Sequence, residues 1–415
     1  MADIEVHIEL DSSVRRVGTL HRNPGRGGES PSFEYASGWL EDPGAYALEP
    51  MLMRTAGAFV PRPGLRLFGS IGDSAPDTWG RRLMQRGERR LAARDGRAVR
   101  TLTEIDYLLG VADETRLGAL RFRQAPDMPF LAPPRLGVPP LVELGRLLGI
   151  TDRVLRDEET DEDFQIILAP GSSLGGARPK ASVLDQHGRL SIAKFPKETD
   201  DYSVESWQEI ALRLAERAGI DTPEHQLIQV AGRAVLVSRR FDRAGRSRIP
   251  FVSAMTMTGS RDGEQGSYPE LVDVLASHGS QSGADAHALY RRMVFNVLIS
   301  NVDDHLRNHG FLRLHATGWT LSPAYDLNPV PTDVKPRILT TRITPDDGTC
   351  SLDLVEEACG YFDLTLPQAR AIIREVADAT TTWRSVARAV GVRKAECDRM
   401  ASAFDHADLG RALSF

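Results

Sequence analysis

Apolar and polar residues alternate in the first part of the chain. Apolar residues occupy every second position from Ile4 to Leu10, with charged or His residues between them, and this period of two predicts a strand with one buried face. Further strands are predicted near residues 17–20 and 33–35. Residues 1–70 therefore predict a small β-rich unit.

The spacing of apolar residues becomes helical from residue 77. Trp79 and Leu83 are four positions apart, as on one face of a helix, and the run that continues to residue 94 predicts a long helix. Residues 102–109 and 141–148 predict two more helices. Six prolines between residues 126 and 140 predict an extended connector.

Short strands and one helix are predicted between residues 165 and 260. The strands are expected at residues 181–184, 190–195, 227–230 and 234–238, and the helix at residues 204–218. From residue 265 helices dominate, and two short strands are expected at residues 310–312 and 319–321. The C-terminal helices are expected at residues 268–275, 286–300, 366–390 (with a break) and 394–404.

This order of elements predicts an α+β fold with the two-lobe organisation of a protein kinase. A small β-rich N-terminal subdomain, turning helical, is expected at residues 1–125. A lobe with short strands is expected at residues 126–260, and a helical C-terminal lobe at residues 261–415. A chain of 415 residues is too long for one simple core, which agrees with such a division.

Composition is ordinary for a soluble globular protein, with 41% hydrophobic and 26% charged residues. The net charge of −6 provides no overall basic footprint for nucleic acid. A run of arginines lies in the helix predicted from residue 77, and we interpret it as a solvated helix face rather than a nucleic-acid contact. Its members are Arg81, Arg82, Arg86, Arg89 and Arg90.

The three cysteines argue against a disulfide framework or a zinc site. Cys350, Cys359 and Cys397 are widely spaced, and no two of them form a CxxC pair. The acidic N-terminus does not resemble a signal peptide, and no apolar run reaches the roughly 20 residues that span a bilayer. We therefore expect a cytoplasmic protein that does not contact membranes.

Three polar residues near the start of the helical lobe carry the strongest functional signal. Asn308 follows Asp303 by five residues, and Asp326 follows Asn308 by eighteen. In kinase-type phosphoryl transfer one Asp orients or deprotonates the attacking hydroxyl, and an Asn and a second Asp hold Mg²⁺. Each residue alone favours a cap or a turn. The apolar helix before this set and the two strands predicted within it match the context that the mechanism needs.

His305 lies in the same short polar loop. Without His or Cys partners at metal-ligand spacing, a single His favours a structural hydrogen-bonding role over a metal site.

A glycine-rich segment at residues 172–180 precedes a lysine in a predicted strand. The segment matches neither the Walker A pattern nor the GxGxxG pattern of ordinary kinases, so alone it favours a structural turn. Lys194 follows Lys180 by fourteen residues, where a kinase lysine would reach the α- and β-phosphates. A surface lysine is the simpler interpretation of Lys194 alone, but a glycine turn followed by a strand lysine is more specific.

A kinase lysine of this kind pairs with a helical Glu. The helix predicted at residues 204–218 contains Glu205, Glu209 and Glu216, of which we favour Glu209. The strand predicted at residues 234–238 leads into a charged segment that would be the adenine hinge of a kinase. An ordinary exit from a strand is the alternative.

Together these motifs resemble the HipA family of serine/threonine kinases, the toxin halves of bacterial toxin–antitoxin pairs. The resemblance covers essentially the whole chain. It is carried by Ser173-Leu174-Gly175-Gly176-Ala177-Arg178-Pro179-Lys180, Ala193-Lys194-Phe195-Pro196, Arg240-Phe241-Asp242-Arg243, Asn301-Val302-Asp303-Asp304-His305-Leu306-Arg307-Asn308, Ser322-Pro323-Ala324-Tyr325-Asp326-Leu327, and an N-terminal match at Leu67-Phe68 and Asp73-Ser74-Ala75-Pro76-Asp77-Thr78-Trp79-Gly80.

The resemblance implies a role for each matched residue. Asp303 is expected to be the catalytic base, and Asn308 and Asp326 are expected to hold Mg²⁺. Lys194 is expected to contact the phosphates of ATP. The other residues expected at the ATP site are Gly175, Gly176, Ala177, Arg178, Pro179 and Lys180 in the covering loop, Arg239 and Phe241 at the hinge, and His305 and Tyr325 beside the nucleotide.

The resemblance also implies regulation and partners. Ser173 matches a serine that family members autophosphorylate, and a phosphate there would repel the loop from a site that holds other phosphates; the adjacent Ser172 is the alternative acceptor. Family members phosphorylate an aminoacyl-tRNA synthetase and so arrest growth. A small helix-turn-helix antitoxin restrains them on operator DNA.

Two other functions remain open from the sequence. A small-molecule kinase would use nearly the same active-site residues. A degenerate kinase fold that serves as a binding or co-repressor module would be non-enzymatic, but such a site usually loses one of Asp303, Asn308, Asp326 and Lys194, and all four are present.

Overall fold

The computed structural model describes residues 3–25, 28–131, 137–168 and 176–415. Residue contacts divide the chain into two compact units, and the chain passes between them several times. Unit 1 comprises residues 1–198, 230–233 and 239–252, and unit 2 comprises residues 199–229, 234–238 and 253–415. Each unit is described by itself. The three-part division predicted from the sequence stays a prediction.

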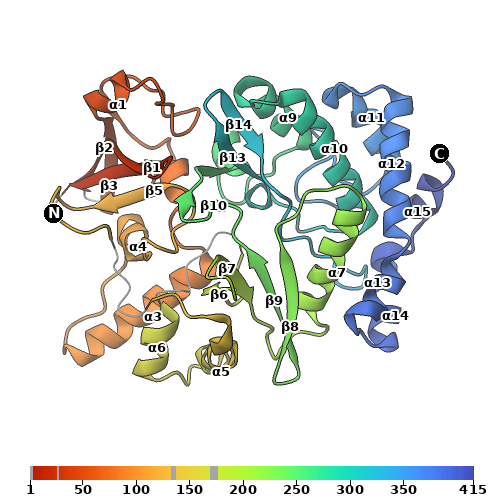
Figure 1. Cartoon of the computed structure of the whole chain (residues 1–415), viewed down its shortest axis with the longest axis horizontal. Coiled ribbons are helices and arrows are strands. Elements are labelled where there is room, and N and C mark those ends of the chain that lie inside the picture. Colours follow the sequence, from red (N-terminus) through yellow and green to blue (C-terminus); the bar gives the residue numbers. More distant parts are fainter. Residues whose placement is uncertain (1–2, 26–27, 132–136, 169–175) are drawn as a thin grey trace. The chain divides into compact units, whose positions relative to one another are not determined.

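A five-stranded antiparallel sheet forms the N-terminal part of unit 1 (Figure 1). Its strand order is β4-β3-β2-β1-β5. The alternation predicted for the first strand is present, because Ile4, Val6 and Ile8 are buried. The edge strand β5 was not predicted, since four residues carry little periodicity. The strands are β1 (Ile4–Leu10), β2 (Ser13–Gly25), β3 (Gly28–Tyr35), β4 (Ala58–Phe59) and β5 (Leu120–Arg123).

Helices α3 (Thr78–Arg94), α5 (Leu144–Leu155) and α6 (Asp161–Leu168) form a small core in unit 1. Trp79 and Leu83 of α3 pack there with Ile150, Val154, Phe164 and Ile167. The sequence predicts α3 and α5 but not α6, because the acidic first turn of α6 belongs to a polar run at residues 158–163. Negative residues favour a helix N-terminus. The other helices are α1 (Ser37–Glu41), α2 (Gly69–Gly72), α4 (Glu104–Gly110) and the 3₁₀ turn η1 (Leu141–Glu143).

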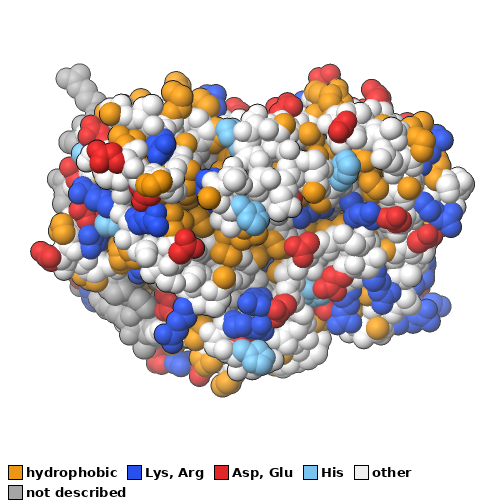
Figure 2. Space-filling view, turned by 45° about the horizontal axis from the view of Figure 1, so that its top comes forward, with side chains coloured by type: hydrophobic (Ala, Val, Ile, Leu, Met, Phe, Trp, Pro, Cys, Tyr) orange, Lys and Arg blue, Asp and Glu red, His pale blue; other side chains and the backbone are white. Residues whose placement is uncertain are grey.

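The arginine run on α3 is largely paired within unit 1. Arg81 contacts Glu104 at 2.6 Å, and both Arg86 and Arg90 contact Glu159 at 3.1 Å. The face of the molecule in Figure 2 likewise intersperses Lys and Arg with Asp and Glu. The three paired arginines are half-buried, whereas Arg82 and Arg89 are exposed.

Asp242 is the centre of a buried ionic cluster in unit 1. Its carboxylate accepts hydrogen bonds from Arg240 Nε (2.6 Å), Arg243 Nη1 (2.7 Å) and Gly118 N (2.7 Å). Burial acts to raise the pKa of Asp242, but Arg240 and Arg243 hold it well below its usual range. Asp242 therefore stays ionised and is the shared counter-ion of two buried arginines.

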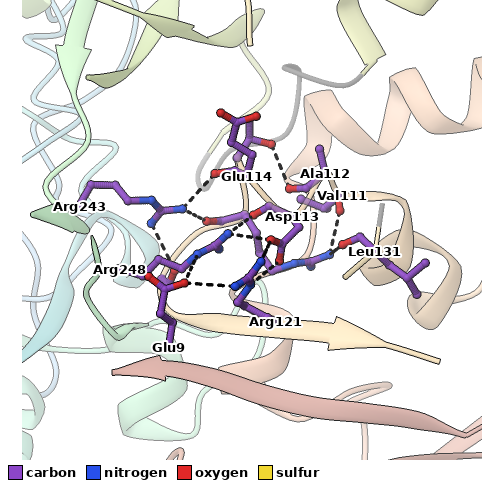
Figure 3. Close-up of polar contacts among 12 residues, drawn as sticks. Glu9, Val111, Ala112, Asp113, Glu114, Arg121, Leu131, Arg243 and Arg248 are labelled. Carbon is purple, nitrogen blue, oxygen red and sulfur yellow. Dashed lines mark hydrogen bonds and ion pairs between the residues drawn. The ribbon is translucent and has the colours of Figure 1, made fainter. Parts of the chain in front are cut away.

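Arg240, Arg243 and Arg248 also bind backbone carbonyls within residues 113–118, and Figure 3 shows Arg243 and Arg248 among these contacts. Arg240 donates to Thr115 O at 3.0 Å, Arg243 to Arg116 O at 2.7 Å and Arg248 to Asp113 O at 2.7 Å. A loop held away from water needs partners for its carbonyl groups, and the arginines supply them. Two short strands carry Arg243 and Arg248: β10 (Arg243–Ala244) and β11 (Ser247–Arg248).

A hairpin of β6 (Lys180–Leu184) and β7 (Leu190–Lys194) completes unit 1. Its register places Lys180 opposite Lys194. Trp79 Nε1 donates to Lys180 O at 3.0 Å, which fixes the first strand to the start of α3. Both strands were predicted from the sequence.

Unit 2 is mostly helical. Its central helix, α10 (Ser282–Leu298), is buried from Met293 to Leu298 and packs against α9 (Tyr268–His278) and α12 (Leu366–Thr380). No helix in the described part of the chain is long and apolar enough to cross a membrane. The other helices are α7 (Val204–Arg217), α8 (Ala254–Thr258), α11 (Leu352–Ala358), α13 (Trp383–Val390), α14 (Lys394–Phe404) and α15 (Ala407–Ala412), with 3₁₀ turns η2 (Leu306–Asn308) and η3 (Cys359–Phe362).

The remaining strands are short. Strands β13 (Gly310–His315) and β14 (Gly318–Leu321) form an antiparallel hairpin where two strands were predicted. Neighbouring strands β8 (His225–Val230) and β9 (Arg233–Arg239) were also predicted. Strand β12 (Phe251–Ser253) was not.

The break predicted within residues 366–390 separates α12 from α13. Thr381 Oγ1 donates to Asp378 O at 2.8 Å and Thr382 Oγ1 to Ala379 O at 2.7 Å. Such side-chain bonds compete with the helical pattern. After the break, Trp383 stacks on Phe404 of α14, with ring centroids 4.7 Å apart.

His406 caps α15 in its neutral form. Its Nδ1 accepts a hydrogen bond from Leu409 N (3.3 Å), and its Nε2 lies 3.1 Å from Leu298 O. Burial, and then the charge of Arg337, lower the pKa of His406 to about 4. A protonated ring could not accept the capping bond.

Removing Asp242 should destabilise the protein strongly. We expect Asp242→Ala to lower the free energy of unfolding by about 3–5 kcal/mol, because two buried arginines lose their counter-ion. Urea denaturation followed by circular dichroism would measure the loss. The matched control is Asp127→Ala, an exposed carboxylate of unit 1, expected to change stability by under about 0.5 kcal/mol. Equal small losses in both variants would contradict the role of Asp242.

His406 should make stability depend on pH in the acidic range. Its folded-state pKa of about 4 lies below the ordinary 6.5, so the unfolded state binds more protons between these values. The stabilising contribution is complete above pH 6.5 and is lost as the pH falls towards 4, by at most about 3 kcal/mol. Denaturation midpoints measured across this range should fall less steeply in His406→Asn. Parallel curves for the two proteins would exclude the effect.

Candidate active site

The loop that carries Asp303 begins where α10 ends. Ser300 has a positive φ of 52°, which turns the chain out of the helix, and its Oγ donates to Ala403 O at 2.9 Å. Asn301 N donates to Asn296 O at 2.9 Å, which holds the start of the loop against the last turns of α10. The loop therefore leaves a buried helix in a defined direction.

Asp303 and Asn308 lie across this loop from each other. Asn308 Nδ2 donates to Asp303 O at 3.2 Å, and Asn308 N to His305 O at 2.7 Å. The Asp303 side chain is 57% exposed, whereas Asn308 is 6% exposed. An exposed carboxylate on a fixed backbone can be reached by a hydroxyl group of another molecule.

The β13–β14 hairpin returns the chain to the same loop. Phe311 pairs with Leu321, and Ser322 N donates to Gly310 O at 2.9 Å. Just beyond, Tyr325 Oη donates to Arg307 O at 2.7 Å. These bonds bring Asp326 beside the loop of Asp303 and Asn308, although eighteen residues separate it from Asn308.

Asp326 has a left-handed backbone conformation, with φ at 59°. Two amides hold its side chain: Asn328 Nδ2 donates to Asp326 Oδ1 at 3.2 Å, and Gln208 Nε2 of α7 donates to the same atom at 3.2 Å. A non-glycine residue in this region is uncommon and must be held by its surroundings. These two hydrogen bonds fix the orientation of the Asp326 carboxylate.

A chain of buried hydrogen bonds connects Asp326 with Asp304. Asn328 N donates to Asn301 Oδ1 (3.1 Å), Asn301 Nδ2 to Asn296 Oδ1 (3.0 Å), and Asn296 Nδ2 to Tyr268 Oη (2.9 Å). In the last hydrogen bond of this series, Tyr268 Oη donates to Asp304 Oδ2 at 2.5 Å. Burial, and then the negative charge of Asp304, raise the pKa of Tyr268 well above its usual value, so the phenol remains a donor.

The geometry fits a magnesium ion held by Asn308 and Asp326. Asn308 Oδ1 is buried and has no hydrogen-bond partner, and a buried amide oxygen without a partner is available to a cation. Mg²⁺ binds oxygen, often through only one or two carboxylates with phosphate and water completing the shell. No cluster of three or more His, Cys, Asp or Glu residues suited to a metal occurs in the described ranges.

The predicted phosphate-binding residues lie in unit 1. Lys194 ends β7, and Gly176 has a φ of 86°, a conformation that glycine adopts readily. Lys180 Nζ forms an ion pair with Asp77 Oδ2 at 2.8 Å, and both side chains are buried. Asp77 Oδ1 also caps α3 by accepting from Gly80 N at 2.8 Å. The structure thus joins Lys180 to the N-terminal motif around Asp77.

The other predicted residues of unit 1 have different surroundings. Arg239 is the last residue of β9, and the ring centroid of Phe241 lies 6.1 Å from that of Phe251. Arg240, Asp242 and Arg243 of the same motif form the buried cluster described above. Ala177, Arg178 and Pro179 precede β6. Ser172, Ser173 and Gly175 lie outside the described residues.

Glu209, the favoured partner of Lys194, has both carboxylate oxygens occupied within unit 2. It accepts from Arg213 Nε at 2.6 Å and contacts His225 Nδ1 at 2.7 Å. Glu205, one turn earlier on α7, is 1% exposed.

The structure brings together the predicted residues of unit 2, namely Asp303, His305, Asn308, Tyr325 and Asp326. The residues that support them are not predicted from the sequence: Tyr268, Asn296 and Asn328. Asn328 follows Asp326 by two positions, a spacing common in side-chain turns. Tyr268 and Asn296 had no local signal, because each acts through contacts with distant segments.

Comparison with known proteins identifies the family. The model of the HipA-like C-terminal domain matches residues 172–384, which is more than half of the chain. The solved structure of HipA from Shewanella oneidensis, in a complex with HipB and operator DNA, has a TM-score of 0.69 and 16% identity, and the alignment covers 99% of this chain and 96% of that one. This likeness confirms the predicted kinase-like α+β fold.

Two curated relatives are described as candidate kinases. One from Haemophilus influenzae is 24% identical over 180 residues, and Y4dM from Sinorhizobium fredii is 30% identical over 153 residues. The matches cover 38% and 33% of this chain and only 52% and 36% of those relatives.

The chain belongs to the HipA-like C-terminal domain family. The resemblance predicted from the motifs is confirmed.

Tyr268 should position the catalytic loop without touching the nucleotide. We expect Tyr268→Phe to reduce phosphoryl transfer about 10-fold while MgATP affinity changes by less than about 3-fold, because Asp304 loses one buried hydrogen bond. Calorimetry and single-turnover transfer would separate the two effects. Tyr361→Phe, a change on an exposed side chain of unit 2, is the control. Equal losses of transfer in both variants would contradict the role of Tyr268.

Proposed function

We propose that the protein is a kinase that uses ATP and Mg²⁺ to phosphorylate a serine or threonine hydroxyl of another protein. The observation that carries this proposal is the arrangement of Asp303, Asn308 and Asp326 in unit 2. The hairpin and the buried amides hold an exposed carboxylate, an amide oxygen without a partner and an oriented second carboxylate around one loop. Kinase-type phosphoryl transfer uses this set of groups.

The proposed reaction is a single transfer. The bond between the γ-phosphorus and the oxygen bridging to the β-phosphate breaks, a bond forms from the γ-phosphorus to the substrate hydroxyl oxygen, and ADP leaves. Asp303 orients the hydroxyl and accepts its proton. When bound, Mg²⁺ neutralises charge on the phosphates, and Asn308 and Asp326 would be its protein ligands.

The remaining predicted residues would bind the nucleotide. Lys194 would contact its phosphates, with a Glu of α7 as its acidic partner and Glu209 favoured among them. The adenine end would face Arg239 and Phe241, and His305 and Tyr325 would also contact the nucleotide. Gly175 to Lys180 would cover the phosphates, with Lys180 oriented by its ion pair with Asp77.

The biological role is proposed by analogy within the family. The Shewanella structure contains HipA with HipB and operator DNA. We propose that this chain likewise acts as the toxin of a pair with a small helix-turn-helix antitoxin, and that it contacts operator DNA through or alongside that partner. Its substrate would be an aminoacyl-tRNA synthetase, and phosphorylation of Ser173 would switch the kinase off.

Phosphate transfer should depend on Asp303 and Asp326. After incubation with MgATP, intact-mass analysis of the wild-type protein should show one added phosphate, mapped by peptide analysis to Ser173 rather than Ser172. Asp303→Asn and Asp326→Asn should each reduce the rate at least about 100-fold, because the base or a metal ligand is lost. Asp346→Asn, an exposed carboxylate in unit 2, should behave as wild type.

The other outcomes distinguish the alternatives. No added phosphate but normal ATP binding would favour a kinase that acts only on another molecule, and radiolabel appearing only on small molecules would favour a small-molecule kinase. Absence of ATP binding would favour a degenerate binding module. Transfer that survives in Asp303→Asn would contradict the proposed mechanism.

A further inference from the structure

The chain after Asp326 passes back across the loop that carries Asp303. Val330 N donates to Ser300 O at 3.1 Å, so the passing segment begins at the start of that loop. Further along, Thr340 N donates to Val302 O at 3.2 Å and Thr341 N to Asp304 O at 2.8 Å. Residues 331–339 thus form an arch, with its first end bonded to Ser300 and its second end to Val302 and Asp304, the two neighbours of Asp303.

The arch has internal structure of its own. Val334 N donates to Pro331 O at 3.0 Å, and Lys335 N to the same oxygen at 3.4 Å, which forms a turn. Pro336 fixes the backbone directly after Lys335. Thr332 N donates to Ser402 Oγ of α14 at 3.1 Å, so the arch is also attached to the helical core. These contacts give Lys335 a defined position.

Lys335 extends from the arch to Asp303. Its Nζ lies 3.1 Å from Asp303 Oδ1, and the two side chains are 53% and 57% exposed. An ion pair this exposed stabilises a fold by at most about 1 kcal/mol. The contribution to stability is therefore small, while the location places an ammonium group beside the proposed catalytic base.

The loop itself offers no comparable cation towards Asp303. Arg307 is directed to Asp262, with Nε and Nη2 each 2.9 Å from a carboxylate oxygen. Among the described residues, Lys335 is the one Lys or Arg whose side chain forms an ion pair with Asp303.

We propose that Lys335 is a further catalytic residue, whose ammonium group binds the phosphoryl group during transfer. This inference rests on the proposed kinase function. A hydroxyl held by Asp303 must have the γ-phosphoryl group on its other side, within reach of a flexible lysine whose Nζ starts 3.1 Å from Asp303. In the transition state, charge lies on the three equatorial phosphoryl oxygens, and a cation placed there stabilises it. Lys335 keeps its proton and forms no covalent bond.

The main test uses a mimic of the phosphoryl group in the transition state of transfer. Affinities of the full-length protein for MgADP and for MgADP with aluminium fluoride would be measured by calorimetry. We expect Lys335→Met to bind MgADP within about 3-fold of wild type but to lose about 10- to 100-fold in affinity for the fluoride complex, because a transition-state contact is lost. Lys335→Arg should recover part of that loss. Lys394→Met, which removes an exposed charge elsewhere in unit 2, is the matched control and should bind both as wild type does.

Phosphoryl transfer provides the second measurement. Lys335→Met should lower the single-turnover rate by a factor similar to its loss of affinity for the fluoride complex, with KM for ATP nearly unchanged. Agreement of the two factors would support a contact made in the transition state. A lysine that merely shapes the arch would not produce this agreement.

Three results would overturn the proposal. Unchanged fluoride-complex affinity in Lys335→Met, with transfer intact, would leave the kinase function standing and remove Lys335 from it. Equal losses for MgADP and the fluoride complex would make Lys335 an ordinary nucleotide ligand. Absence of MgATP binding by the wild-type protein would overturn both this inference and the proposed function.

Discussion

The side-chain amide of Asn301 joins the three segments on which the candidate active site depends. Its Nδ2 donates to Asn296 of α10, and its Oδ1 accepts from the backbone of Asn328. Asn301 is 1% exposed, so each polar atom must find a partner within the protein. This one residue therefore holds the end of α10, the start of the Asp303 loop and the segment of Asp326 in a fixed arrangement.

The buried network explains how an exposed active-site loop can be precise. The Asp303 side chain is 57% exposed, as a base that meets the proposed substrate would be, so few contacts hold it. Its neighbour Asp304 is directed inward, where Tyr268 and His309 contact its carboxylate at 2.5 and 3.0 Å. These contacts of Asp304 fix the backbone between the two aspartates on its buried side. Asp303 therefore keeps its orientation although its side chain is exposed.

Motifs of unit 1 that suggest nucleotide chemistry turn out to have structural partners as well. Asp77, far from Lys180 in the chain, forms a buried ion pair with it and caps α3. Asp242 is the shared counter-ion of Arg240 and Arg243, which bind carbonyl groups within residues 114–118. Loss of one partner of either ion pair would leave a buried charge without its counter-ion. A motif can therefore require its residues for folding even where it borders a proposed site.

The arch of residues 331–339 is held to the loop of Asp303 by its backbone. Its ends use backbone hydrogen bonds to the loop of Asp303, which hold the arch there whatever side chains it carries. The side chain at the turn of the arch, Lys335, is therefore the part available for a catalytic role.

Local patterns in the sequence determined much of the secondary structure. Alternation identified β1, helical spacing identified α3 and α10, and the spacing of Asp303, Asn308 and Asp326 indicated kinase-type chemistry before any fold was known. Helix α6 and strand β5 were overlooked because short elements carry little periodicity, and tertiary packing decides them.

Tertiary structure alone decided the partners of the buried polar groups. Glu209 of α7 contacts His225 as well as Arg213, and no local pattern indicates that His225 lies beside it. Nothing near Lys335 in the chain indicates that it meets Asp303, 32 residues away. Periodicity reports which face of an element is buried, whereas the pairing of charges depends on where distant backbone segments meet, and only the folded chain contains that information.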